Sequence, residues 1–344
     1  MTRVLTIAAC ATVTLAVGLA AGGCGAARSS SARTAATTNI PATAARHSPR
    51  AAPAPATRPV GQPVHVRVPG QLPVAITKTS AVVLADGRLL VVGGLVDGTS
   101  TTDIWAGTPS GTKRLIGHLP QAMHDAALAR VGATVLHVGG GATAQFDGIR
   151  TVQVRTGTER VTGHLPRPAS DLGVAVIDDA AYVVGGFDGA AWLDTVTRIG
   201  ATGTAPRVVA HLPFGLRYAA VGSLDRMLYV AGGTRSNGAD SAAVFRVDPR
   251  TGRVTRLRDL RHPTAHAVFV NVRGSLVLAG GRVGTAGAHE VLGFSPASGY
   301  TRLVGRIPDG IADPAPVALP DGTALLVGGS TAADHPSSSI LQVR

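Results

Sequence analysis

Beyond residue 61, short apolar runs alternate along the chain with clusters of Gly, Asp and Pro. The stretch 172–211 shows the pattern well, with apolar runs at 172–177, 181–186, 195–199 and 207–211. Runs of this length bounded by turn residues are typical of antiparallel strands in hairpins. The stretch therefore predicts four β-strands joined by tight turns.

Two markers repeat in register along the chain. A glycine pair ends an apolar run six times, and its first members are Gly93, Gly139, Gly185, Gly232, Gly280 and Gly328. Their spacings are 46, 46, 47, 48 and 48 residues. About twenty residues before each pair stands a Leu-Pro dipeptide or a variant of it, beginning at Leu72, Leu119, Leu165, Leu212, Leu260 and Ile307. Six copies of one four-stranded unit predict blades around a channel.

Residues 181–189 read Ala-Tyr-Val-Val-Gly-Gly-Phe-Asp-Gly, which resembles a kelch repeat, an apolar strand ending in Gly-Gly. Kelch repeats usually place a Tyr after the glycine pair and a Trp later, and most repeats of this chain lack both. The resemblance extends over residues 62–344. It implies an all-β fold, a six-bladed β-propeller of the kelch type.

The two ends of the repeat region fit one blade. After the sixth glycine pair a single strand remains, at 338–344, so the last blade is one strand short. Residues 63–68 align with the fourth strands of the other blades. We expect this N-terminal strand to close the last blade, because closing the ring removes open sheet edges.

Composition separates the N-terminal region from the body. The net charge is +12, but residues 1–70 hold seven Arg and no acid, which leaves 25 basic and 20 acidic residues beyond them. The body shows no interleaved aromatic and basic residues, so we expect no nucleic-acid partner. The N-terminal arginines either lie near anionic lipid or wall polymer or only keep a linker soluble.

The first 24 residues have the pattern of a secretory signal. Arg3 precedes an uncharged apolar run at 4–21, and small residues lead to Cys24, which predicts a signal peptide over residues 1–23. Residues 21–24, Ala-Gly-Gly-Cys, resemble a bacterial lipobox. The resemblance implies lipidation of Cys24 and attachment to the outer face of the cytoplasmic membrane. Cleavage to a free secreted protein and an uncleaved membrane anchor are the alternatives.

Residues 24–61 are mainly Ala, Ser, Thr, Pro and Arg. Such a segment buries too little apolar surface to offset its ordering entropy, so it predicts a disordered tether. The propeller then occupies residues 62–344, and we expect it to be a monomer.

The sequence offers few residues for metal binding or thiol chemistry. The two cysteines, Cys10 and Cys24, both precede the propeller, so it has no disulfide and no thiol nucleophile. His118, His164 and His211 recur at one repeat position, which favours a structural role over a metal site. We expect no metal and no cofactor.

One position of the repeat is a candidate binding site. It lies five residues after the proline of each Leu-Pro marker, or its equivalent, where the innermost strands begin at the channel mouth. The residues there are Lys78, Asp125, Asp171, Tyr218, His266 and Asp313, with His124 and Arg217 just before two of them. Both charge signs, His and Tyr suit a polar or sugar-like ligand. Alternatively these residues hydrate the mouth or form hydrogen bonds to neighbouring blades.

Trp192 is a separate candidate. It is either an exposed residue that anchors a partner or a residue that packs on the next blade.

No nucleophile elbow with clear partners, His-Glu-x-x-His sequence or phosphate loop occurs. We interpret the chain as a non-catalytic cell-surface module that binds a protein or a glycan. The alternative is an extracytoplasmic carbohydrate mutarotase or epimerase, which resembles the kelch-type sialic-acid mutarotases and needs an acid and a base at the mouth.

Replacing Cys24 by Ser tests the predicted anchor. In a bacterial host, the wild-type protein should sediment with membranes and incorporate a labelled lipid precursor, because the thiolate would receive the diacylglycerol. The Cys24→Ser variant should lose the label. Label that persists in the variant would contradict lipidation at this residue.

Overall fold

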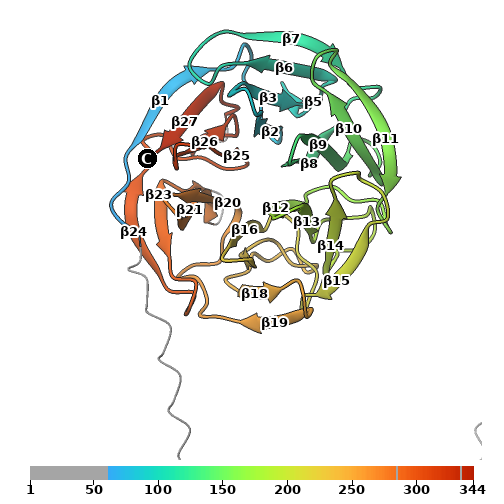
Figure 1. Cartoon of the computed structure of the whole chain (residues 1–344). Coiled ribbons are helices and arrows are strands. Elements are labelled where there is room, and N and C mark those ends of the chain that lie inside the picture. The colour runs from blue at the N-terminus through green and yellow to red at the C-terminus, as the bar shows by residue number, and fades with distance from the viewer. Residues whose placement is uncertain (1–60, 284–285, 334) are drawn as a thin grey trace, which may run out of the picture. The chain divides into compact units, whose positions relative to one another are not determined.

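The computed structural model describes residues 61–283, 286–333 and 335–344. The predicted signal peptide and all but the last residue of the predicted tether lie outside the described residues. Six four-stranded antiparallel sheets form blades around a central channel (Figure 1), which confirms the predicted fold class and repeat count. No described residue belongs to a helix that is long and apolar enough to cross a membrane.

Each blade is built from the channel outward in chain order. The first three blades are β2 (Ser80–Val83), β3 (Leu89–Val92), β6 (Asp103–Gly107) and β7 (Lys113–His118) in blade I; β8 (His124–Val131), β9 (Thr134–Gly141), β10 (Gly148–Gln153) and β11 (Thr158–His164) in blade II; and β12 (Gly173–Ile177), β13 (Ala180–Val184), β14 (Thr195–Gly200) and β15 (Arg207–His211) in blade III.

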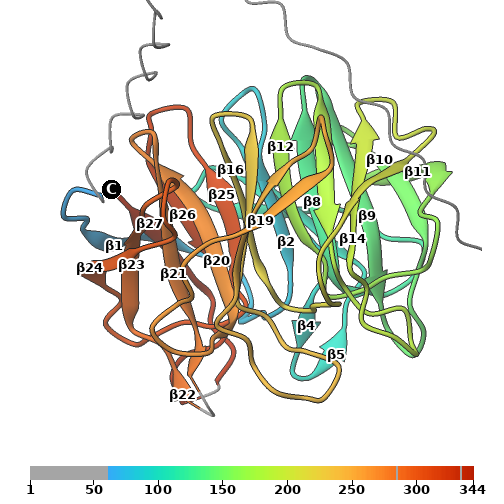
Figure 2. The ribbon, with the colours of Figure 1, turned by 90° about the horizontal axis from the view of Figure 1, so that it is seen from below.

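The other three blades follow the same plan, except that the N-terminal β1 is the outermost strand of blade VI. They are β16 (Ala220–Leu224), β17 (Met227–Ala231), β18 (Val244–Asp248) and β19 (Arg253–Arg256) in blade IV; β20 (Ala265–Val272), β21 (Ser275–Val283), β23 (Glu290–Phe294) and β24 (Thr301–Arg306) in blade V; and β25 (Ala315–Ala318), β26 (Ala324–Val327), β27 (Ser339–Val343) and β1 (Val66–Gln71) in blade VI. Short strands β4 (Leu95–Val96), β5 (Thr99–Ser100) and β22 (Ala286–Gly287) extend loops on one face of the ring (Figure 2).

The N-terminal strand closes the ring as predicted. Strand β1 pairs antiparallel with β27, with Val66 opposite Val343. The strand begins later than the predicted 63–68, because the Val64 N–H donates to the Val304 carbonyl of blade V, at 2.9 Å. The chain therefore first runs along blade V and only then enters blade VI.

Blade faces pack on both neighbours, which explains the continuous apolar runs of the second strands. In β9, Leu136 and Val138 belong to a core cluster shared with blade III, whereas Val135 belongs to a cluster shared with blade I. Both faces of a second strand are thus removed from water, and β3, β13 and β26 are buried at every position.

The glycine pairs connect each blade to the next. In every pair the second glycine donates its N–H to a carbonyl of the following blade, at 2.7–2.9 Å, and the acceptors are Met123, Ala169, Leu216, Thr264, Ile311 and Ile76. Both glycines of each pair have positive φ. A Cβ on the first glycine would lie only 2.0–2.6 Å from that same carbonyl oxygen. The pair therefore needs glycine both for its backbone conformation and for the close approach of the next blade.

A substitution at Gly232 measures how much this close approach between blades contributes to stability. Gly232→Ala should lower the free energy of unfolding by about 2–5 kcal/mol, through left-handed strain and overpacking, since its Cβ would lie 2.0 Å from the Thr264 oxygen. The control is Gly238→Ala, which shares positive φ but meets nothing within 4 Å and should lose only about 1–2 kcal/mol. Equal losses in urea denaturation would contradict a role for the contact.

Candidate functional site

The structure brings the six predicted mouth residues together. In each blade, one carbonyl accepts a hydrogen bond from the glycine pair of the preceding blade. The mouth residue lies two positions after that carbonyl, where the chain enters the innermost strand. Each has a left-handed backbone, with φ between 51° and 62° for Lys78, Asp125, Asp171, Tyr218, His266 and Asp313. Among the described residues, five hydrogen bonds of 2.9–3.3 Å join the N–H of each later member to the carbonyl of the member one blade before. These six residues, linked in order from Lys78 to Asp313, are here called the mouth ring.

A left-handed conformation is uncommon for residues other than glycine, and such strain often accompanies functional sites. Here it recurs in all six blades, so it is part of the blade plan. Its effect is to place six side chains of four kinds around one axis.

The side chains of the mouth ring bond across the channel. Lys78 Nζ donates to the Tyr218 hydroxyl at 3.1 Å, although blades I and IV lie on opposite sides of the ring. Lys78 Nζ also lies 3.2 Å from a carboxylate oxygen of Asp125. Lys78 thus links three blades and narrows the mouth.

Arg217 occupies the position next to the ring. Its Nη2 lies 2.7 Å from Asp171 Oδ2 and donates to the Tyr218 hydroxyl at 2.7 Å. Its guanidinium carbon lies 4.9 Å from the Phe187 ring centroid and 5.6 Å from that of Trp192. Two aromatic rings and a carboxylate therefore hold this cation in place.

Two histidines complete the site. His266 Nδ1 lies 2.6 Å from Asp313 Oδ1, and the His266 ring stacks on Tyr218 with centroids 4.0 Å apart. His124 Nδ1 shares a 2.8 Å hydrogen bond with the Ser100 hydroxyl. Every predicted ligand-binding residue thus belongs to one connected polar cluster.

Sequence reasoning missed Phe187 and Ser100 as members of this cluster. Phe187 directly follows a glycine pair, at the position where kelch repeats usually carry Tyr, and that placement was the available signal. Ser100 had none, because the residue at its place in the loop differs from blade to blade, as Trp192 and Asp240 show.

Burial changes the acidity of several groups in the ring. Burial foremost, and then the neighbouring Asp171, raise the pKa of Asp125 well above its ordinary value, although Lys78 opposes the shift. Burial and the nearby carboxylates raise the pKa of Tyr218 to about 12. Burial, assisted by the Lys78 charge, lowers the pKa of His124. Burial would also lower the pKa of Lys78, but the surrounding acidic groups, Asp125 first, raise it.

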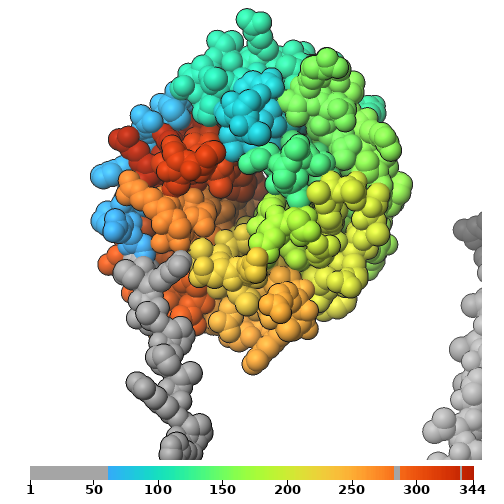
Figure 3. Space-filling model, viewed as in Figure 1, coloured from blue at the N-terminus to red at the C-terminus, as the bar shows by residue number. Residues whose placement is uncertain are grey.

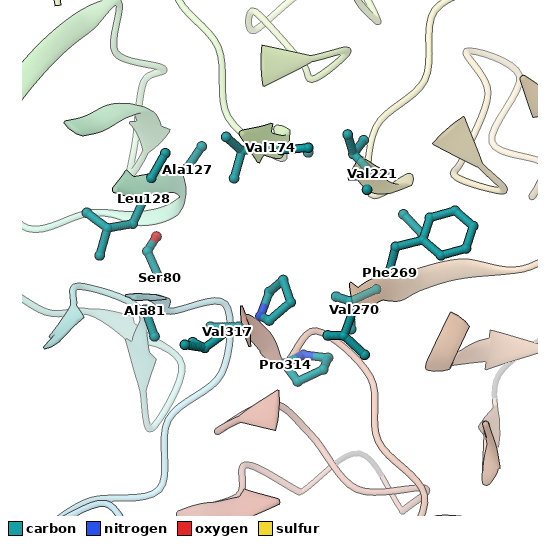
Figure 4. A pocket seen from close by; sticks show the side chains of 18 of the residues that line it. Ser80, Ala81, Ala127, Leu128, Val174, Val221, Phe269, Val270, Pro314 and Val317 are labelled. Atoms are coloured by element: carbon teal, nitrogen blue, oxygen red, sulfur yellow. The ribbon is translucent and has the colours of Figure 1, made fainter. Parts of the chain in front are cut away.

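Beneath the mouth ring lies a cavity of about 390 Å³. The space-filling view shows the hollow at the centre of the ring of blades (Figure 3). Its wall is made by the innermost strands, and the close view shows mostly small and apolar side chains around it, among them Ala127, Val174, Val221 and Val317 (Figure 4). Apart from Arg130, the charged residues that line the cavity belong to the mouth ring.

The other aromatic and histidine candidates have structural surroundings. Trp192 is half-buried, packs on Phe187 with centroids 5.0 Å apart and approaches Gly215 of the next blade. The repeated histidines each face an Asp at or directly before the start of the third strand in their own blade, with Nδ1-to-carboxylate distances of 3.3 Å for His118, 3.2 Å for His164 and 3.1 Å for His211. Within the described ranges, no group of three or more His, Cys, Asp or Glu is arranged to hold a metal ion.

Comparisons with known proteins agree with this architecture. A family model described as the Kelch motif matches residues 215–261. The solved structure of YjhT superimposes with a TM-score of 0.67 at 15% identity, over 79% of this chain and 96% of that one. No curated protein matches the sequence. At this identity the likeness establishes the fold.

The raised pKa of Asp125 predicts a pH-dependent stability difference. The native state binds the proton more tightly than the unfolded state, so ionisation of Asp125 removes stability as the pH rises from about 3.8, the ordinary value, toward the raised native pKa. Asp125→Asn cannot ionise, and its stability relative to wild type should therefore increase with pH across that window. Urea denaturation at successive pH values measures the difference.

The control is Asp321→Asn, since hydrogen bonds from Thr323 lower the pKa of Asp321. A lowered pKa gives stability that is present above the ordinary value and lost as the pH falls, so this variant should weaken relative to wild type as the pH rises through the acid range. A flat or falling difference for Asp125→Asn would contradict the raised pKa.

Proposed function

Because the chain is a six-bladed β-propeller of the kelch type, we propose that it binds a glycan at the mouth ring without transforming it. The observation that carries the proposal is the convergence of six side chains of four kinds, all in one backbone conformation, on the axis of the channel. Their donors and acceptors could meet the hydroxyl groups of a sugar, and the Tyr218–His266 stack offers an apolar ring face.

The charges of the ring favour a neutral polyhydroxylated ligand over an ion. Arg217 is already paired with the Asp171 carboxylate, and His266 is paired with Asp313. An anion would have to break such a pair and leave a buried charge unmatched, which is costly. Kelch propellers commonly bind protein ligands, and a protein partner at the mouth loops is the other outcome of the binding test.

We also propose that the propeller is displayed on the outer face of the cytoplasmic membrane. The support is the secretory pattern of residues 1–23 and the lipobox-like sequence that ends at Cys24. Both lie outside the described residues.

Two matched histidine variants test the glycan proposal. His266→Asn should weaken binding about 10- to 100-fold, the effect of losing a hydrogen bond to a charged group, in a glycan array followed by calorimetry. His164→Asn breaks a comparable His–Asp pair at the rim and should bind as wild type. Wild-type affinity in the His266 variant would show that the mouth is not the site.

Acid–base catalysis is the second candidate function, since Asp125 lies beside Asp171 with a raised pKa, a usual property of a catalytic acid. Exchange spectroscopy of a reducing sugar with the protein should show no acceleration over buffer. Faster anomer exchange that Asp125→Asn abolishes would establish a mutarotase instead.

A further inference from the structure

The positive charge of the body is gathered in one part of the ring. Residues 246–306 hold ten Arg and three acids, whereas the rest of residues 71–344 hold 15 basic and 17 acidic residues. The excess therefore belongs to the outer half of blade IV and to blade V. Its exposed members on strands β19 and β24 and in the loop that follows β19 are here called the basic wall; they are Arg253, Arg256, Arg258, Arg302 and Arg306, of which Arg256 is paired with Asp259.

Contacts between the two blades make the basic wall continuous. The Arg258 N–H donates to the Ser298 carbonyl at 2.9 Å, and the Arg258 guanidinium carbon lies 5.7 Å from the Tyr300 ring centroid. Strands β19 and β24 follow each other along the outer rim (Figure 1). Tyr300 and Leu303 are large and exposed within this surface, each at 44%. Surfaces that bind lipid headgroups typically combine cationic side chains with exposed aromatic and aliphatic side chains, as this surface does.

The N-terminal segment joins the propeller on the same surface. Arg302 Nη2 donates to the Gly61 carbonyl at 2.7 Å, and the Val64 N–H donates to Val304 of β24 at 2.9 Å. The sequence from Cys24 to residue 60 adds five Arg and no acid. A lipid on Cys24 would thus be connected to the propeller at the basic wall. Once the lipid is inserted in a bilayer, the basic wall would be held at a high local concentration near the headgroups.

We propose that the basic wall is a docking surface for the anionic phospholipid headgroups of a membrane. The contact goes beyond the proposed glycan binding and occupies the rim of the propeller. The channel axis then lies parallel to the membrane plane. Both faces of the ring, including the mouth, therefore stay open to ligand.

Vesicle sedimentation tests the proposal without lipidation. Residues 24–344 carrying Cys24→Ser should bind vesicles of phosphatidylcholine and phosphatidylglycerol, in a salt-dependent manner, and should not bind pure phosphatidylcholine. The triple variant Arg253→Gln, Arg258→Gln and Arg306→Gln should lose about fivefold in affinity for each charge, on the order of 100-fold in all.

The matched control removes three exposed arginines from the outermost strands of blades I to III, by Arg114→Gln, Arg160→Gln and Arg207→Gln. It has the same net charge as the first triple variant and should lose much less affinity. Circular dichroism melting of both variants verifies that they fold.

Three results would overturn the proposal. The first is an equal loss of vesicle affinity in both triple variants, which would show that only the net charge of the protein matters. The second is the absence of binding to anionic vesicles by the wild-type sequence. The third is tighter binding to a soluble glycerol-phosphate polymer than to vesicles at equal phosphate, which would make the partner a free polyanion.

Discussion

Adjacent blades are joined where the second glycine of each pair donates its N–H to a carbonyl of the next blade, at 2.7–2.9 Å. The first glycine makes room for that carbonyl, since any Cβ there would meet the oxygen at 2.6 Å or less. The contact occurs at all six interfaces, including that from blade VI to blade I, where Gly329 donates to Ile76. A closed ring cannot relax one interface without straining the others, and the spacing of blades therefore depends on this repeated contact.

The same carbonyl determines where the candidate site lies. The residue two positions after it turns into the left-handed region, and from blade II to blade VI its N–H bonds to its counterpart in the preceding blade. Because the backbone alone sets this geometry, the side chain at each ring position is free to differ. One scaffold can thus hold Lys78, Tyr218 and His266 at equivalent places, as expected when function resides in side chains carried by a shared fold.

Charge is distributed in two different ways over the molecule. At the mouth, buried groups are matched, as in the 2.7 Å pair of Arg217 and Asp171, because an unpaired charge there would lose its hydration without compensation. A second buried set, His137 and Glu159 at 2.6 Å, follows the same rule in blade II. On the outer strands of blades IV and V water screens the arginines, so an excess of one sign is tolerated there and remains available to a partner.

The sequence by itself determined the fold class, the blade count, the closing strand and the six equivalent ring positions, because the repeat spacing reports directly on strands and blade contacts. It placed some strand ends one or two residues off, as at 181–186 against Ala180–Val184, where the glycine pair leaves the β conformation. Only the tertiary structure decided that Lys78 reaches Tyr218 across the axis, that Phe187 covers Arg217 and that Gly61 joins the basic wall. These partners are distant in the chain and differ from blade to blade, and their contacts depend on side-chain direction, which a repeat period does not encode.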